Sequence, residues 1–126
     1  MILVDTSVWV RFLRGAEPFA SGLEEVLSRD EVCGHEMVYG ELLIGDPSGR
    51  SKLLSAYALM HQLPTVRHAE VAQFVRDRRL SGRGIGWVDA HLLASAVLSG
   101  ERLWSADKRL VSAAEALAVA YRPGHA

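Results

Sequence analysis

Short apolar runs alternate with longer helical patterns along the chain. Residues 2–4 are apolar and bounded by a polar cluster, which is typical of a buried strand. The predicted strands span residues 2–4, 32–33, 64–66, 102–105 and 118–121. One predicted helix begins at Thr6 and stops at Gly15, and a second begins at Pro18. The other predicted helices span residues 35–45, 52–62, 69–80, 88–98 and 108–116. Strands that alternate with helices predict an α/β fold with a central, mainly parallel sheet flanked by helices.

One domain accounts for the whole chain of 126 residues, so residues 1–126 are predicted to fold as a unit. The clearest loop is Gly-Asp-Pro-Ser-Gly at residues 45–49, and residues 122–126 are expected to be a frayed tail. No apolar run approaches the length of a membrane span. Met1 leads directly into a predicted strand, so no signal peptide is expected. A single cysteine, Cys33, is typical of a protein of the reducing cytoplasm, where we expect this one to lie in the core.

The net charge of −1 excludes a general polyanion binder, so any nucleic-acid contact requires a local basic patch. Such a cluster stands at the end of the helix predicted over residues 69–80 and contains Arg76, Arg78, Arg79 and Arg83. It has two interpretations: a solvated helix end whose cations complement the helix dipole, or a rim that contacts RNA phosphates. The two are compatible.

Four acidic residues adjoin or interrupt apolar segments: Asp5, Glu41, Asp89 and Asp107. Asp5 and Asp107 follow predicted strands, where ligands of open α/β sheets bind. Asp5, Asp89 and Asp107 also precede or open helices, so each has the alternative of a helix N-cap. Glu41 falls in mid-helix with Val38 at helical spacing, so capping does not explain it; the alternatives are a structural salt bridge and a metal ligand.

Electrostatic repulsion distinguishes isolated caps from a cluster. Two carboxylates 4 Å apart repel by roughly 4 kcal/mol at an effective dielectric near 20. Four converging carboxylates would therefore require a cation or take up protons. Because all the donors are oxygens and no Cys/His set has zinc spacing, the favoured ion is Mg²⁺ or Mn²⁺.

The order of the motifs resembles a PIN domain, and in particular the VapC toxins of bacterial type II toxin–antitoxin pairs. The motifs are LVDTS around Asp5, GELLIG around Glu41, DAHLLASA from Asp89 and SADK around Asp107. The resemblance covers essentially the whole chain. It implies a metal-dependent endoribonuclease, a hydrolase that cleaves RNA phosphodiester bonds, with the four acids as catalytic metal ligands. Thr6 and Ser105 fall where a hydroxyl supports the first acid or the metal shell, although threonine is commoner than serine at the second position.

The resemblance also implies partners. They are an RNA substrate such as a tRNA or a ribosomal RNA loop, a small VapB-type antitoxin, and a second copy in a homodimer that forms a heterotetramer or larger assembly with the antitoxin. Spare apolar surface for the antitoxin is expected around Leu43, Ile44 and residues 53–59. Trp87, two residues before Asp89, is placed either to stack on an unpaired base or to anchor its helix. Together with Arg76, Arg79 and Arg83, it forms the predicted RNA-binding set.

Two other functions compete with the nuclease. A haloacid-dehalogenase-type phosphatase would need a second aspartate two residues after Asp5, where this chain has Ser7. A non-catalytic module that binds RNA or a protein partner would use the acids as caps and one salt bridge, and would show no effect of metal on stability.

Overall fold

Strand β1 (Ile2–Val4) is the central strand of a three-stranded parallel sheet of order β2-β1-β3. It pairs with β2 (Val32–Cys33) on one side and with β3 (Arg102–Trp104) on the other. The computed structural model describes residues 1–46 and 51–124, so the loop predicted at 45–49 lies mostly outside the described residues. Apart from the exposed Arg102 at the start of β3, all residues of the three strands are apolar and buried, as a parallel sheet covered by helices requires. The predicted α/β fold is confirmed.

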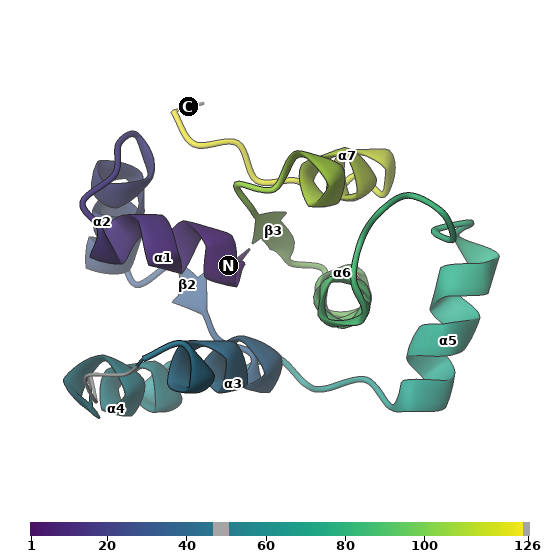
Figure 1. Ribbon diagram of the computed structural model, residues 1–126, viewed down its shortest axis with the longest axis horizontal. Coiled ribbons are helices and arrows are strands. Elements are labelled where there is room, and N and C mark those ends of the chain that lie inside the picture. The colour runs from purple at the N-terminus through teal and green to yellow at the C-terminus, as the bar shows by residue number, and fades with distance from the viewer. Residues whose placement is uncertain (47–50, 125–126) are drawn as a thin grey trace.

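Seven helices flank this sheet in the described part of the chain (Figure 1). They are α1 (Thr6–Leu13), α2 (Phe19–Ser28), α3 (Glu36–Ile44), α4 (Ser51–Leu59), α5 (His68–Asp77), α6 (Trp87–Ser99) and α7 (Lys108–Ala116). Helices α1 and α2 pack together, as do α3 with α4 and α5 with α6. None of the helices in the described ranges is long and apolar enough to cross a bilayer.

The strand predicted over residues 64–66 does not form. The backbone pairs earlier instead, in an isolated parallel bridge between Gln62 and Gly34, the residue that follows β2. Proline lacks the N–H that a ladder needs, and the Pro64 carbonyl accepts the Ser95 hydroxyl at 3.0 Å instead of a strand partner.

The strand predicted over residues 118–121 is reduced to one bridge between Leu103 and Ala120. Two backbone hydrogen bonds connect Leu103 with this segment, from its own N–H to Val119 and from the Tyr121 N–H to its carbonyl. Ala118 has φ 60°, so the chain is still turning out of α7 two residues before the bridge at Ala120. The prediction located the segment beside β3 but was wrong about its length.

The core joins the three strands to buried side chains of α1, α2, α3, α4, α6 and α7. Trp9, Trp104 and Cys33 are all nearly inaccessible, which confirms their predicted place in the core. The Trp9 ring packs edge-to-face on Tyr57 from α4, with centroids 5.6 Å apart. Burial raises the pKa of the Cys33 thiol to about 11, so this thiol is a structural group and not a reactive one.

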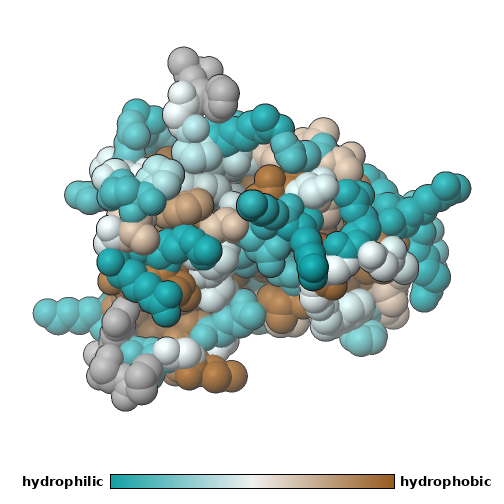
Figure 2. Space-filling model, turned by 45° about the horizontal axis from the view of Figure 1, so that its top comes forward, coloured by the Kyte–Doolittle hydropathy of each residue, from teal (hydrophilic) through white to brown (hydrophobic). Residues whose placement is uncertain are grey.

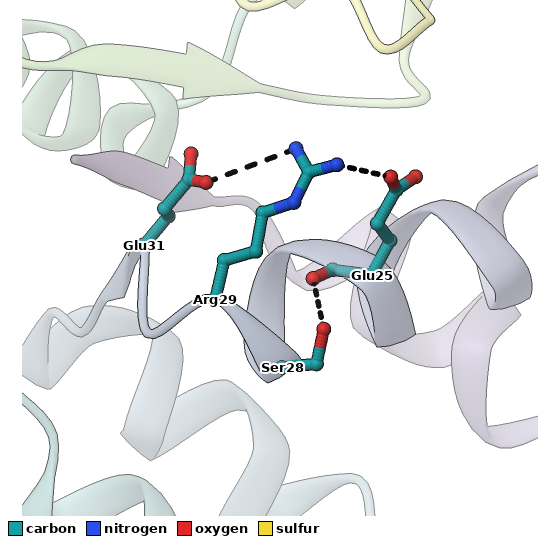
Figure 3. Close-up of polar contacts among 4 residues, drawn as sticks. All are labelled: Glu25, Ser28, Arg29 and Glu31. Atoms are coloured by element: carbon teal, nitrogen blue, oxygen red, sulfur yellow. Dashed lines mark hydrogen bonds and ion pairs between the residues drawn. The ribbon is translucent and has the colours of Figure 1, made fainter.

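Charged side chains stabilise the turn between α2 and β2 on the surface (Figure 3). Arg29 lies between two carboxylates, with its guanidinium 2.5 Å from Glu25 and 3.9 Å from Glu31. The Ser28 hydroxyl donates to the Glu25 carbonyl at 2.6 Å. These groups are exposed, so the pairs contribute about 1 kcal/mol or less and serve mainly to define the turn.

A fully buried histidine connects α3, α4 and α6. The His35 Nδ1 accepts the Met37 N–H at 3.0 Å, so its Nε2 carries the proton and donates to the Ser95 hydroxyl at 2.9 Å. The Tyr57 hydroxyl accepts the His35 N–H at 2.9 Å. Only a neutral imidazole satisfies this arrangement, because a proton on Nδ1 would face another donor. Burial accordingly lowers the pKa of His35 below 6.5.

The free energy of unfolding should therefore fall as pH drops below about 6.5. Below this pH, His35 binds a proton in the unfolded chain but stays neutral in the folded protein. Each such histidine contributes a slope of up to about 1.4 kcal/mol per pH unit. Denaturant unfolding between pH 7.5 and 5 measures this slope. His35→Asn keeps a helix cap and should reduce the slope, whereas His61→Asn, at an exposed site, should leave it unchanged. Identical slopes for all three proteins would contradict this role of His35.

Candidate active site

Parallel pairing brings the ends of β1 and β3 to the same edge of the sheet. Asp5 follows β1 and its N–H donates to the Trp104 carbonyl at 2.8 Å, so the ladder continues to the acidic residue. Ser105 follows β3 directly, and Asp107 comes two residues later. Residues that are 100 apart in sequence therefore lie in contact, as the strand-end argument predicted.

Asp5 is buried and is held by hydroxyl groups. Its side chain is only 6% exposed, and Oδ2 accepts hydrogen bonds from Ser7 at 2.6 Å and from Ser105 at 2.9 Å. Asp5 occupies the N-cap position of α1 but makes no side-chain capping bond, which argues against the capping alternative. No lysine or arginine in the described ranges pairs with it. A carboxylate with this burial and these partners remains available for a cation.

Ser7 is a site residue that the sequence reasoning missed. Its hydroxyl donates to Asp5 and accepts the Ala106 N–H at 3.0 Å, while the Ser105 hydroxyl accepts the Asp107 N–H at 3.0 Å. The two serines thus connect the start of α1 to the segment after β3, with Asp5 between them. The available signal was the adjacency of Ser7 to Asp5 in the DTS motif. The predicted support of the first acid by Ser105 agrees with this geometry.

Asp89 lies in the first turn of α6 and is partly buried. Its Oδ2 accepts the Gly86 N–H at 3.0 Å, an N-terminal capping bond. The pKa of Asp89 is raised chiefly by burial; the Gly86 bond opposes this rise, and the charges of Asp5, Asp107 and Glu41 add to it. The charges of the other three predicted acids thus all act on the pKa of Asp89 in the same direction.

Asp107 combines a helix cap with a place in this neighbourhood. It is the N-cap of α7, and its Oδ1 accepts N–H groups from Arg109 at 2.9 Å and Leu110 at 3.5 Å. The capping alternative is therefore correct for Asp107. Because both bonds use Oδ1, no hydrogen bond from the described residues engages Oδ2.

Glu41 is exposed on α3, so the apolar pattern around it does not form one buried face. Val38 is fully buried, but Ile44 is 88% exposed. Thr6 donates to the Glu41 Oε1 at 2.6 Å, so this hydroxyl supports the second acid instead of the first. The salt-bridge alternative finds no support, because no cationic group of the described residues lies within 4 Å of Glu41.

The chemistry of these donors suits a hard divalent cation, since all are carboxylate oxygens. Their positions are not those of a closed site: within the described ranges, no three His, Cys, Asp or Glu side chains form a metal-binding group. Two of the acids have hydrogen-bond partners of their own: Glu41 accepts the Thr6 hydroxyl, and Asp89 accepts the Gly86 N–H.

Beside Glu41, a cleft of about 170 Å³ opens between α1, α3 and α4. Val10, Leu42 and Leu54 contribute apolar lining. Exposed apolar side chains continue this surface on α3 and α4, where Leu43, Ile44 and Leu59 are 51%, 88% and 87% exposed. Figure 2 shows brown hydrophobic side chains at the lower left, on the side where Figure 1 places these helices. The predicted apolar surface around Leu43 and Ile44 is present, whereas Tyr57 within residues 53–59 is buried.

The arginine cluster spans the end of α5, which stops at Asp77, earlier than predicted. Arg76 alone lies in the last helical turn, where it contacts Gln73 at 3.2 Å, and Arg78 lies over the Phe74 ring at 5.5 Å. Among the described residues, neither arginine pairs with a carboxylate, and Arg79 and Arg83 also lack such a pair.

Arg83 instead connects the α5–α6 turn to α7, through the Ser112 hydroxyl at 3.1 Å. Arg109 crosses the same turn, because a Cβ at Gly84 would lie 2.7 Å from its Cδ. Arg109 is thus a further cation beside Asp107, and the sequence reasoning missed it because it stands outside the arginine cluster.

Trp87 takes the anchoring role, one of the two that its sequence position allowed. Its ring packs on His68 and His91, with centroids 4.7 and 5.2 Å apart, so it anchors the start of α6. The side chain nevertheless remains 41% exposed.

Ser7→Ala should lower the free energy of unfolding by about 1–3 kcal/mol, because it removes a bond to Asp5 and leaves the Ala106 N–H without its partner. Urea unfolding compares it with Ser21→Ala, a control on the exposed face of α2 whose hydroxyl contacts Glu17. A loss no larger than that of the control would contradict the bridging role of Ser7.

Comparisons with known proteins agree with this geometry. The PIN domain family model matches residues 2–116. Ribonuclease VapC32 of Mycobacterium tuberculosis, in strains CDC 1551 and H37Rv, is 48% identical over 114 residues, which cover 90% of each chain. The crystal structure of PAE2754 from Pyrobaculum aerophilum shares the fold, with a TM-score of 0.57, 17% identity, and coverage of 89% of this chain and 83% of that one. The chain therefore belongs to the PIN domain family and is a VapC-type member of it.

Proposed function

We propose that this protein is a metal-dependent endoribonuclease and the toxin of a VapBC-type toxin–antitoxin pair. The observation that carries the proposal is a buried Asp5 carboxylate at the end of the central strand, held by two serine hydroxyls and without a cationic partner among the described residues. The 48% identity to a protein named ribonuclease VapC32 supports the reaction and the substrate class.

Asp5 and Asp89 are the main metal ligands in this proposal, and Glu41 and Asp107 complete the set. When bound, Mg²⁺ or Mn²⁺ would lower the pKa of a coordinated water and neutralise the phosphate charge. The serine hydroxyls on Oδ2 fix the Asp5 carboxylate, so it needs little reorganisation. Thr6 orients Glu41, and the Oδ2 of Asp107, which no hydrogen bond from the described residues engages, is available to a metal ion.

Water is the nucleophile in this mechanism, so the products carry 5′-phosphate and 3′-hydroxyl ends. The carboxylates position the reaction and do not attack the phosphorus. Arg76, Arg79, Arg83 and Arg109 supply the positive charge that binds the RNA backbone outside the acidic cluster.

The proposed partners follow the same reasoning. The apolar cleft beside Glu41 and the exposed Leu43, Ile44 and Leu59 suit a small VapB-type antitoxin. A homodimer that joins the antitoxin in a heterotetramer or larger complex, an RNA loop of tRNA or rRNA as the substrate, and a cytoplasmic location remain predictions.

Purified, antitoxin-free protein should cleave total cellular RNA into discrete fragments in Mg²⁺ or Mn²⁺ and not in EDTA. Asp5→Asn should reduce the rate at least roughly a hundredfold because it removes a ligand charge. It should remain folded, since asparagine still accepts the serine hydroxyls. Gel electrophoresis with sequencing of the fragment ends measures both the rate and the end chemistry.

Asp30→Asn is the matched control, because Asp30 is exposed on the α2–β2 turn and asparagine tolerates its φ of 55°. Near-normal cleavage by folded Asp5→Asn would contradict the assignment. A folded wild-type protein that cleaves nothing, and whose melting temperature does not respond to Mn²⁺, would favour the non-catalytic module that binds RNA or a protein.

A further inference from the structure

A second pocket, separate from the apolar cleft, opens beside Asp89. Its volume is about 140 Å³, and Val75, Leu80, Ser81, Ile85 and Trp87 form much of its wall. Gly82, Gly86 and Ala90 complete the lining. The pocket is therefore built by the α5–α6 turn and the first turn of α6.

Two residues that line this pocket are connected to Asp89, one by a hydrogen bond and one by the peptide chain. Gly86 lines the pocket, and its N–H donates to Asp89 at 3.0 Å. Ala90, the next residue after Asp89, lines the pocket as well. A ligand in the pocket would thus contact the sequence neighbour of Asp89, one of the four predicted metal ligands.

The size of the pocket suits a single aromatic ring. An engineered cavity of about 150 Å³ in another protein binds one benzene molecule. Pockets for drug-sized ligands occupy about 300 Å³ or more, so this one suits only a fragment of a larger substrate. A two-ring purine would leave one ring outside.

Trp87 gives the pocket a rigid aromatic wall. The imidazoles of His68 and His91 pack on its ring, so little side-chain entropy remains to be lost on binding. The side chain is 41% exposed, which leaves surface for a ligand. Base–aromatic stacking contributes about 1–3 kcal/mol per base.

The charge around the pocket favours a polyanion. Arg79 and Arg83 border the lining residues in sequence, are exposed, and pair with no carboxylate of the described residues. Arg83 is held to Ser112, and Arg109 lies over Gly84 in the same turn. An apolar peptide would gain nothing from these cations, whereas an RNA strand would place its phosphates beside them.

We infer that this pocket binds one unpaired pyrimidine base of the RNA substrate, stacked on Trp87, while the flanking phosphates contact Arg79, Arg83 and Arg109. The inference rests on the proposed nuclease function and adds a base-recognition subsite to it. It makes the α5–α6 turn a determinant of which RNA phosphodiester reaches Asp89.

The test measures the affinity of fluorescein-labelled hexanucleotides by anisotropy, in EDTA so that no cleavage occurs. The probes are hexauridylate, hexaadenylate and an abasic oligomer of equal charge, so backbone electrostatics cancel in the comparison. Hexauridylate should bind at least fivefold tighter than the abasic oligomer, and tighter than hexaadenylate. Because Trp9 and Trp104 are buried, quenching of the intrinsic fluorescence reports on Trp87.

Two variants locate the effect. Trp87→Leu removes the stacking surface, and Ser81→Phe fills the pocket; both should abolish the preference for uridine. Ser55→Phe, which introduces the same side chain at an exposed site on α4, should retain it.

Three outcomes would overturn the inference. They are equal affinities of the wild type for hexauridylate and the abasic oligomer, hexaadenylate binding as tightly as hexauridylate, and an unchanged preference in both pocket variants. Fluorescence quenching by the peptide acetyl-Gly-Leu-Gly-amide without any uridine preference would assign the pocket to a protein partner. If metal-dependent cleavage of total RNA persists, these results reject the subsite alone; if that cleavage also fails, the proposed function fails with it.

Discussion

The bonds between Asp5 and the hydroxyls of Ser7 and Ser105 set the geometry of the candidate site. They hold a carboxylate in a nearly inaccessible position at the end of the central strand. The same serines accept hydrogen bonds from the N–H groups of Ala106 and Asp107, so the segment after β3 is held against the segment after β1. Repulsion is the cost of this arrangement, because Asp89 experiences the charges of Asp5, Asp107 and Glu41 in addition to its own burial. A divalent cation would convert this repulsion into binding energy.

The electrostatics of the surrounding surface complement this acidic centre. The whole chain carries a net charge of −1, so its overall field does not attract RNA. Positive charge is concentrated instead on the α5–α6 turn and on α7, beside the acids. The glycines of this turn are part of the arrangement, since Gly84 has φ +79° and leaves room for the Arg109 side chain. The apolar cleft lies on α1, α3 and α4, at the Glu41 end of the site. In the proposed function, RNA contact and antitoxin contact therefore fall on different elements, with the four acids between them.

Much of this organisation followed from the sequence. Asp5 and Asp107 stand directly after apolar strands, and parallel pairing brings such positions to one edge whatever their separation along the chain. The predicted helix over residues 108–116 agrees with α7 because Asp107 caps its start and the apolar spacing is regular. By contrast, residues 64–66 are apolar without strand pairing and residues 118–121 form only one bridge, since hydrogen-bond partners in a sheet depend on tertiary position.

Side-chain partners were the least predictable part of the site. The sequence placed Ser7 beside Asp5, but the contact with Ala106 depends on a segment 99 residues away. Thr6 contacts Glu41 because α3 packs on α1, which no local pattern encodes. The exposure of Ile44 likewise depends on which neighbouring helices cover α3. Local sequence patterns identified the acidic residues of the site, whereas packing between distant elements determines which side chains contact them.

A double-mutant cycle on Asp5 and Asp89 is the most direct test of the claim that the acids form one cation-responsive cluster. The free energy of unfolding would be measured in EDTA and in Mn²⁺ for the wild type, Asp5→Asn, Asp89→Asn and the double variant. In EDTA, the double substitution should stabilise less than the sum of the single effects, because either change removes the same repulsion. Mn²⁺ should stabilise the wild type and leave the double variant unchanged. Additive effects in EDTA, together with no response of the wild type to Mn²⁺, would contradict the account.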